Sequence, residues 1–215
     1  MAEKVSVPVA VHLDHGDSFE RCMEMLKIGF TSIMYDGSAY PVEENARRTE
    51  EVGKVCRAFG VPLEAEIGEL ARLDDQGRTM GCSNIADPEV VRQYLTLCRP
   101  DSLAIGIGNA HGFYKGKPEL NFKRLAEINK AVDIPFVLHG CTGMDEGLIR
   151  RAINAGVAKI NFGTQIRCQY VEYLKEGLAE GKDEGHAWKL SRFAEEKLRR
   201  DIRDIIRLAG SEGKA

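Results

Sequence analysis

The segment Pro135-Phe136-Val137-Leu138-His139-Gly140 combines the two features that decide the fold, a short apolar run and a His-Gly pair where that run ends. Similar apolar runs recur along the chain, each followed by a segment of helical period; the six runs are 8–11, 31–34, 61–63, 103–105, 135–138 and 157–160. This alternation, at a spacing of roughly 20 to 40 residues, predicts parallel strands joined by crossover helices. Both a doubly wound sheet and a (β/α)₈ barrel have this alternation, although a complete barrel needs eight strand-helix units and only six are found here.

Several helix ends are marked by residues with known capping preferences. Asp87-Pro88-Glu89 supplies an N-cap and a proline at the first helical position, and Gly29 and Gly156 follow periodic segments as C-terminal stops. The stretch 164–209 is predicted to be helical, with a break near 181–185. Because no Gly/Ser-rich linker or low-complexity tract interrupts the 215 residues, we expect one domain over 1–215.

Composition excludes several classes of protein. Lys and Arg total 30 against 33 for Asp and Glu, and no long basic block is present, so nucleic acid is not an expected partner. The longest apolar runs are strand-sized, and the N-terminus has no signal-peptide pattern, so we expect no membrane span and a cytoplasmic location. The six cysteines never form C-x-x-C, which favours reduced thiols over a disulfide framework or a zinc knuckle.

Three of the five histidines stand where an apolar run meets a glycine, in His15-Gly16, His111-Gly112 and His139-Gly140. The carboxyl ends of parallel strands share one edge of the sheet, and ligands bind at that edge. Three imidazoles match the number of protein ligands of a catalytic zinc. The alternative is that each histidine is a core or loop residue bonded to backbone.

Carboxylates accompany the histidines. On an extended strand Asp14 and His15 would point to different sides, so that one faces substrate and the other a metal. Glu64 and Glu66 share one face of the third strand, where neighbouring buried acids are costly unless they bind a metal or orient its ligands. A structural salt bridge is the alternative role for this pair.

A glycine-rich turn follows the fifth strand, in His139-Gly140-Cys141-Thr142-Gly143, and a helix is predicted to begin near Asp145. The backbone N–H groups of such a turn can bind a phosphate, and Asn161, Gly163 and Thr164 at the end of the next strand can complete the site. A plain turn with a helix cap is the alternative.

Taken together, these motifs resemble the class II, zinc-dependent ketose-bisphosphate aldolases, which include fructose- and tagatose-bisphosphate aldolases. The resemblance runs from about Val7 to the C-terminus with the motifs in the family's order; the segments that carry it are His12-Leu13-Asp14-His15-Gly16, Glu64-Ala65-Glu66-Ile67-Gly68, Gly108-Asn109-Ala110-His111-Gly112, Leu138-His139-Gly140-Cys141-Thr142-Gly143 and Lys159-Ile160-Asn161. It implies a TIM barrel, here with about six of the eight βα units and with C-terminal helices. The family's first two strand-helix units are absent, so the sequence is expected to be N-terminally truncated relative to the family.

The resemblance also implies roles for individual residues. His15, His111 and His139 would hold Zn²⁺, with Glu66 as a nearby or alternative ligand, and Asp14 would be the acid/base on the hydroxyl carbon that becomes the aldehyde. The dihydroxyacetone phosphate part of the substrate, and a monovalent cation (Na⁺ or K⁺) bound through backbone carbonyls, would be held by Gly112, Lys115, Gly140, Thr142, Gly143, Asn161 and Thr164.

The implied reaction belongs to carbohydrate metabolism: a ketose bisphosphate, such as fructose- or tagatose-1,6-bisphosphate, is cleaved to dihydroxyacetone phosphate and an aldehyde through a metal-stabilised enediolate. The implied partners are this phosphorylated sugar and further copies of the chain, as a dimer or tetramer.

The chain departs from the family pattern in several places. Ala71-Arg72 replace two glycines of a mobile loop, and Asp74 stands where a glutamate moves the enediolate proton; Cys141 and Gly163 also differ from the usual residues. The alternative function is therefore a catalytically silent, metal-binding or assembly-only paralogue. A barrel metallohydrolase is disfavoured, because it would need a His-x-His pair on the first strand and an aspartate after the last, which here ends in Asn161.

Overall fold

The structure is a computed structural model that describes residues 4–68, 71–73, 79–80, 85–112, 114 and 116–214. No helix in these ranges is both long and apolar enough to cross a membrane. The described cysteines are all free, Cys168 being exposed and the other four buried. Cys82 lies outside the described residues.

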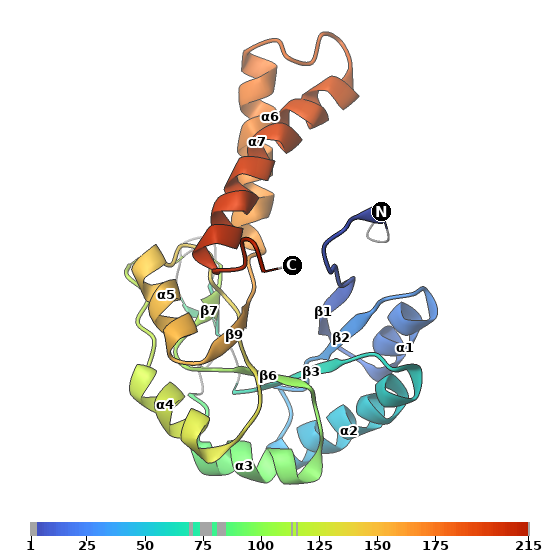
Figure 1. Cartoon of the computed structure of the whole chain (residues 1–215), viewed down its shortest axis with the longest axis vertical. Helices are drawn as coiled ribbons and strands as arrows, with labels where there is room; N and C mark the ends of the chain where they lie inside the picture. Colours follow the sequence, from blue (N-terminus) through green and yellow to red (C-terminus); the bar gives the residue numbers. More distant parts are fainter. Residues whose placement is uncertain are drawn as a thin grey trace.

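Six parallel strands form one curled sheet, in which each strand pairs with the next one along the chain. They are β1 (His12–Gly16), β2 (Ser32–Tyr35), β3 (Leu63–Ile67), β6 (Ser102–Ile105), β8 (Phe136–Leu138) and β9 (Val157–Ile160). Figure 1 shows this sheet as a half-barrel with helices around its outside. The prediction of six units of a (β/α) barrel is confirmed. The two end strands, β1 and β9, have no strand between them within the described residues.

Seven helices complete the described fold: α1 (Phe19–Lys27), α2 (Val42–Phe59), α3 (Pro88–Leu97), α4 (Phe122–Ala131), α5 (Glu146–Asn154), α6 (Thr164–Ala179) and α7 (Ala187–Leu208). Asp87 caps α3 as predicted, and Asp145 caps α5, which begins where the sequence predicts a helix; each side chain accepts a backbone N–H of the first turn. The last two helices pack as a hairpin that projects away from the half-barrel (Figure 1). The predicted C-terminal helical stretch with a central break is therefore confirmed.

The apolar core fills the space between the strands and the outer helices. Its larger part includes Leu103, Phe136 and Leu138 from the sheet and Leu125 and Ile128 from α4. A second part packs β2 against α1 and α2. Each fully buried Leu, Ile or Phe side chain contributes about 1.5–3 kcal/mol relative to exposure. This burial fixes the strands and therefore the positions of the residues at their carboxyl ends.

Two predictions about strands are wrong. The first strand is not 8–11, because its pairing with β2 begins at His12 opposite Ser32, and the valines at 5, 7, 9 and 11 are exposed. The region after Gly68, which the family resemblance implies is a mobile loop, contains β4 (Ala71–Leu73) and β5 (Thr79–Met80), which form a small second sheet with β7 (Ala110–His111). These strands of two or three residues are too short to produce a visible alternation of polar and apolar residues.

Candidate metal centre

Three histidines meet at the carboxyl end of the sheet. The ring centroids of His15 lie 4.8 Å from His111 and 4.7 Å from His139, and those of His111 and His139 are 5.8 Å apart. One ring nitrogen of each lies within 4.8 Å of the corresponding nitrogens of the other two. The structure thus brings together the three residues that the sequence predicts as metal ligands.

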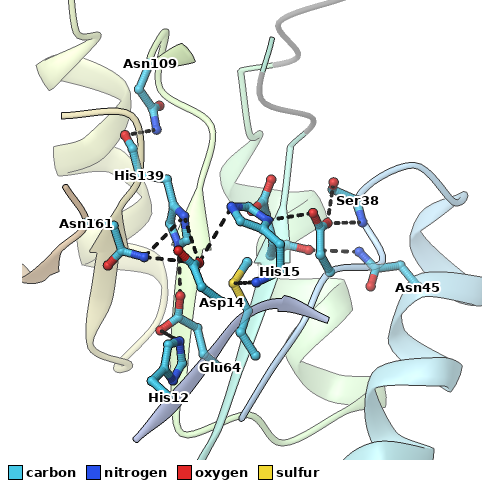
Figure 2. A network of polar contacts seen from close by, with 12 residues as sticks. His12, Asp14, His15, Ser38, Asn45, Glu64, Asn109, His139 and Asn161 are labelled. Atoms are coloured by element: carbon cyan, nitrogen blue, oxygen red, sulfur yellow. Dashed lines mark hydrogen bonds and ion pairs between the residues drawn. The ribbon is translucent and has the colours of Figure 1, made fainter. Parts of the chain in front are cut away.

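Asp14 does not point away from His15 as predicted for a regular strand. The register of β1 shifts between Leu13 and Gly16, and His15 has a left-handed backbone with φ of 52°. Because of this irregularity the Oδ1 of Asp14 lies 3.7 Å from Nε2 of His15 and 3.8 Å from Nδ1 of His139 (Figure 2). The carboxylate and the imidazoles therefore face one shared space.

His15 is oriented by Asp36, which follows β2. The Oδ2 of Asp36 lies 2.8 Å from Nδ1 of His15, and its Oδ1 accepts hydrogen bonds from the backbone and hydroxyl of Ser38. Burial acts to raise the pKa of Asp36, but the hydrogen bonds from His15 and Ser38 outweigh it and lower the pKa to about 2. Asp36 is therefore an acceptor, and Nδ1 of His15 carries the proton. The opposite nitrogen, Nε2, has no hydrogen-bond partner among the described residues.

His139 is held in the same way by Glu64. Its Nε2 lies 2.9 Å from Oε1 of Glu64, and both side chains are buried. The amide of Asn109 donates to the backbone carbonyl of His139 over 3.1 Å. The remaining nitrogen, Nδ1, faces Asn161 and Asp14 (Figure 2). Metal-binding histidines characteristically donate their other N–H to a carboxylate, as both of these rings do.

Glu66 adds a buried carboxylate beside His15. Its Oε2 has no hydrogen-bond partner among the described residues and lies 3.8 Å from Nδ1 of His15. Burial, together with the nearby charges of Asp36 and Glu64, raises the pKa of Glu66 well above its ordinary value. His15, Asp36 and Glu66 form a second close group of possible metal ligands. Unpartnered imidazole and carboxylate atoms in one buried place fit a divalent cation such as Zn²⁺.

Two cavities adjoin the histidines. The inner one, of about 130 Å³, is lined by Asp14, His15, His111, Gly112, His139, Gly140, Thr142, Asn161, Gly163, Thr164 and Arg167. The outer one, of about 560 Å³, includes Asp36, Ser38, Tyr40 and Glu66 and shares Arg167 with the inner cavity. Five of the predicted substrate-binding residues therefore line the inner cavity. Gly143 is exposed and is not in either lining, and Asp74 and Lys115 lie outside the described residues.

Close backbone packing joins the loops that carry His111 and His139. Gly140 has a positive φ of 72°, and a Cβ at this position would lie 2.2 Å from the carbonyl oxygen of Ala110. Because Ala110 precedes His111 and Gly140 follows His139, this contact sets the distance between the two loops. Only glycine fits here.

Three residues at the site were not predicted from the sequence: Asp36, which contacts His15, Lys159, which contacts Glu64, and Arg167, which lines the inner cavity. Asp36 stands in Tyr35-Asp36-Gly37, a polar residue followed by glycine at a strand end, which is the same signal that identified the histidines. Lys159 is a charged residue inside an apolar strand, which is also detectable. Arg167 lies in the first turn of α6, where an arginine gives no distinctive signal.

Comparisons with known proteins agree with this geometry. Residues 1–214 match the family model described as fructose-bisphosphate aldolase class-II. A probable fructose-bisphosphate aldolase of Bacillus subtilis is 39% identical over 212 residues, which are 99% of this chain and 74% of the relative. The sulfofructosephosphate aldolase of Alkalicoccus urumqiensis is 37% identical over 98% of this chain and 74% of its own. The crystal structure of the YdjI aldolase from Escherichia coli K12 superposes with a TM-score of 0.85 at 33% identity, covering 100% of this chain and 73% of that one.

Proposed function

The chain belongs to the class II fructose-bisphosphate aldolase family, and from this premise we propose that it is a zinc-dependent enzyme that cleaves a ketose bisphosphate to dihydroxyacetone phosphate and an aldehyde. The observation that carries the proposal is the convergence of His15, His111 and His139 on one space that the carboxylate of Asp14 also faces. A metal-binding cluster beside an acid/base residue is what metal-assisted cleavage of a carbon-carbon bond requires.

The three histidines would hold the cation, with Glu66 as an adjacent or alternative ligand. When bound there, the ion would supply a Lewis acid that polarises the substrate ketone and stabilises the negative charge that develops on its oxygen. Asp36 and Glu64 hold His15 and His139 so that their second nitrogens face the shared space. Zinc suits this set because imidazole nitrogens and carboxylate oxygens are its usual ligands, together with thiolates.

Asp14 would move the proton of the hydroxyl group on the carbon that becomes the aldehyde. Its side chain is about half exposed, so substrate can reach it. The amide of Asn161 donates to Oδ1 over 3.3 Å and fixes the direction of the carboxylate. Asp74 would move the proton at the carbon of dihydroxyacetone phosphate, a role that rests on the family resemblance alone.

The phosphate of the dihydroxyacetone part would bind at the inner cavity. Gly140, Thr142, Gly163 and Thr164 line this cavity, and the N-terminus of α6 begins there at Thr164. Backbone N–H groups at a helix N-terminus attract anions. Arg167 supplies the only arginine or lysine charge among the described residues of both linings. This combination supports a phosphorylated substrate; Lys115, Gly112 and Gly143 and a monovalent cation complete the proposed site.

The test begins with the purified chain and a chelator. One zinc should bind per chain, and cleavage of fructose-1,6-bisphosphate or tagatose-1,6-bisphosphate, followed by coupled detection of dihydroxyacetone phosphate, should stop after chelation and return with zinc. His139→Ala should abolish both zinc binding and cleavage. Zinc binding without cleavage of either sugar would support the alternative, a silent metal-binding paralogue. Absence of zinc binding would contradict the proposal as a whole.

A further inference from the structure

A continuous network of polar side chains crosses the half-barrel beneath the three histidines. It runs from Ser32 on β2 through His12 on β1, Lys159 on β9 and Glu64 on β3 to His139 after β8. Figure 2 shows His12 and Glu64 directly below His139. Nothing in the proposed reaction uses Lys159 or His12.

The direction of every hydrogen bond in this network follows from the charge of Lys159. An ammonium group only donates. Its Nζ lies 2.7 Å from Oε2 of Glu64 and 3.2 Å from Nε2 of His12, so both of those atoms accept. Burial and the charge of Lys159 lower the pKa of His12, which keeps that ring neutral. The proton of His12 is therefore on Nδ1, which donates to the Ser32 hydroxyl over 2.8 Å.

Glu64 depends on Lys159 for its charge balance. The Glu64 side chain is only 2% exposed, and a carboxylate this deeply buried is costly unless it is paired. Lys159 supplies the only lysine or arginine contact of Glu64 among the described residues. With one oxygen of Glu64 held by Lys159, the other is fixed where it accepts the Nε2–H of His139.

The same lysine also joins the two end strands of the sheet. No backbone pairing between β1 and β9 exists in the described chain. They are connected by side chains, through a part-buried contact of Lys159 with His12 and an exposed one of Asn161 with Asp14. In each pair, a residue at or directly after the carboxyl end of β9 contacts a residue of β1.

We propose that Lys159 is a positioning residue for the metal centre, which acts through Glu64 to hold the His139 ring with Nδ1 toward the other two histidines and through His12 to hold β9 against β1. The inference rests on the proposed function, because it concerns the metal that the histidines would bind. Lys159 itself is not in the lining of either cavity beside the histidines. Partners of this indirect kind typically change metal affinity by about 10–100-fold when they are removed.

The experiment compares zinc affinity, measured by competition with a chromophoric chelator, in wild type, Lys159→Met and Lys159→Arg. The matched control is Lys123→Met, which removes a lysine whose side chain is 89% exposed on α4. Lys159→Met should bind zinc about 10–100-fold more weakly, Lys159→Arg should recover most of that loss, and Lys123→Met should bind as wild type does. The visible spectrum of the Co²⁺-loaded protein should change in Lys159→Met alone, because it reports the geometry of the ligands.

A double-mutant cycle tests the route through Glu64 and also serves if Lys159→Met does not fold. Glu64→Gln keeps an oxygen that can accept from His139 but removes the charge that Lys159 needs. It should weaken zinc binding by a similar factor, and Lys159→Met in the Glu64→Gln background should then change the affinity little, because the interaction it removes is already lost. Wild-type zinc affinity in Lys159→Met or in Glu64→Gln would overturn the inference. Failure of the wild type to bind zinc would instead overturn the proposed function.

Discussion

The Nδ1 atom of His15 donates its proton to Oδ2 of Asp36 across 2.8 Å, and the opposite nitrogen of the same ring faces His111 and His139. This bond selects the tautomer of His15, because a carboxylate with a pKa of about 2 can only accept. The two hydrogen bonds from Ser38 hold the carboxylate itself. The orientation of one of the three clustered histidine rings is therefore determined by a residue that directly follows the neighbouring strand.

Asp36→Asn should weaken zinc binding by about 10–100-fold. An amide can donate to Nδ1 of His15, which would move the ring proton to Nε2 and block the nitrogen that faces the centre. Chelator competition measures the change. Asp17→Asn is the matched control, since Asp17 is an exposed acid of the outer cavity that does not contact the histidine rings. Equal losses in both variants would indicate an effect of net charge and not of ring orientation.

Asp14→Asn should leave zinc binding near normal and reduce kcat for cleavage by about a hundredfold or more, the scale expected for loss of an acid/base residue. The amide keeps the size of the side chain and its position near Asn161 but cannot accept the substrate proton. Steady-state kinetics and zinc affinity are measured on the same preparation. Parallel loss of zinc and activity would place Asp14 among the groups that support the metal.

Gly140→Ala should destabilise the protein more than Gly60→Ala does. Both glycines have positive φ, 72° and 65°, so each alanine costs about 1–2 kcal/mol for the left-handed backbone. Only at Gly140 would the added Cβ also meet the carbonyl of Ala110, which adds about 1–3 kcal/mol of overpacking. Urea denaturation measures both variants, and zinc affinity should fall only in Gly140→Ala. Equal destabilisation would show that the loops carrying His111 and His139 are not in close contact.

The buried thiols should be unreactive at pH 8. Burial raises the pKa of Cys22, Cys98 and Cys141 to about 12, so about one molecule in ten thousand has a thiolate at each position. Ellman's reagent should modify the exposed Cys168 first, and Cys168→Ser should remove this rapid phase. The measurement is made in a Cys82→Ser background. Rapid modification of several thiols in native protein would contradict the packing described for the core.

The same thiols make stability depend on pH in a defined direction. In the unfolded chain their pKa is about 8.5, so the unfolded state loses protons first as pH rises. The free energy of unfolding should therefore decrease as pH increases from about 8.5 toward 12, and no such change should come from these groups at lower pH. Urea midpoints at pH 7, 8 and 10 measure the effect.

Much of the fold is predictable because parallel strands and their helices have clear local signals. The run ending in His139, the Asp87-Pro88 cap and the break near Gly181 each depend on a few neighbouring residues, and each corresponds to an observed element. The meeting of His15, His111 and His139 was predictable for the same reason, since strand ends share one edge.

The relation between Asp14 and His15 was not predictable from alternation. It depends on a register shift and a left-handed residue, which arise from the pairing of β1 with β2 and leave no pattern in the sequence. The link from Lys159 to Glu64 joins positions 95 residues apart, so no local signal reports it. Contacts between distant strands could be inferred only after the sheet was known.

The strand order has a consequence for biosynthesis. Because each strand of the large sheet pairs with its predecessor in the chain, the sheet can extend from one edge while the ribosome is still adding residues. His15 and Glu64 would already be placed in this growing sheet before His111 emerges, and His139 and Lys159 arrive last. The proposed zinc site would therefore have its three histidines only when translation has passed β8, and a nascent chain that pauses before Phe136 would present an incomplete site.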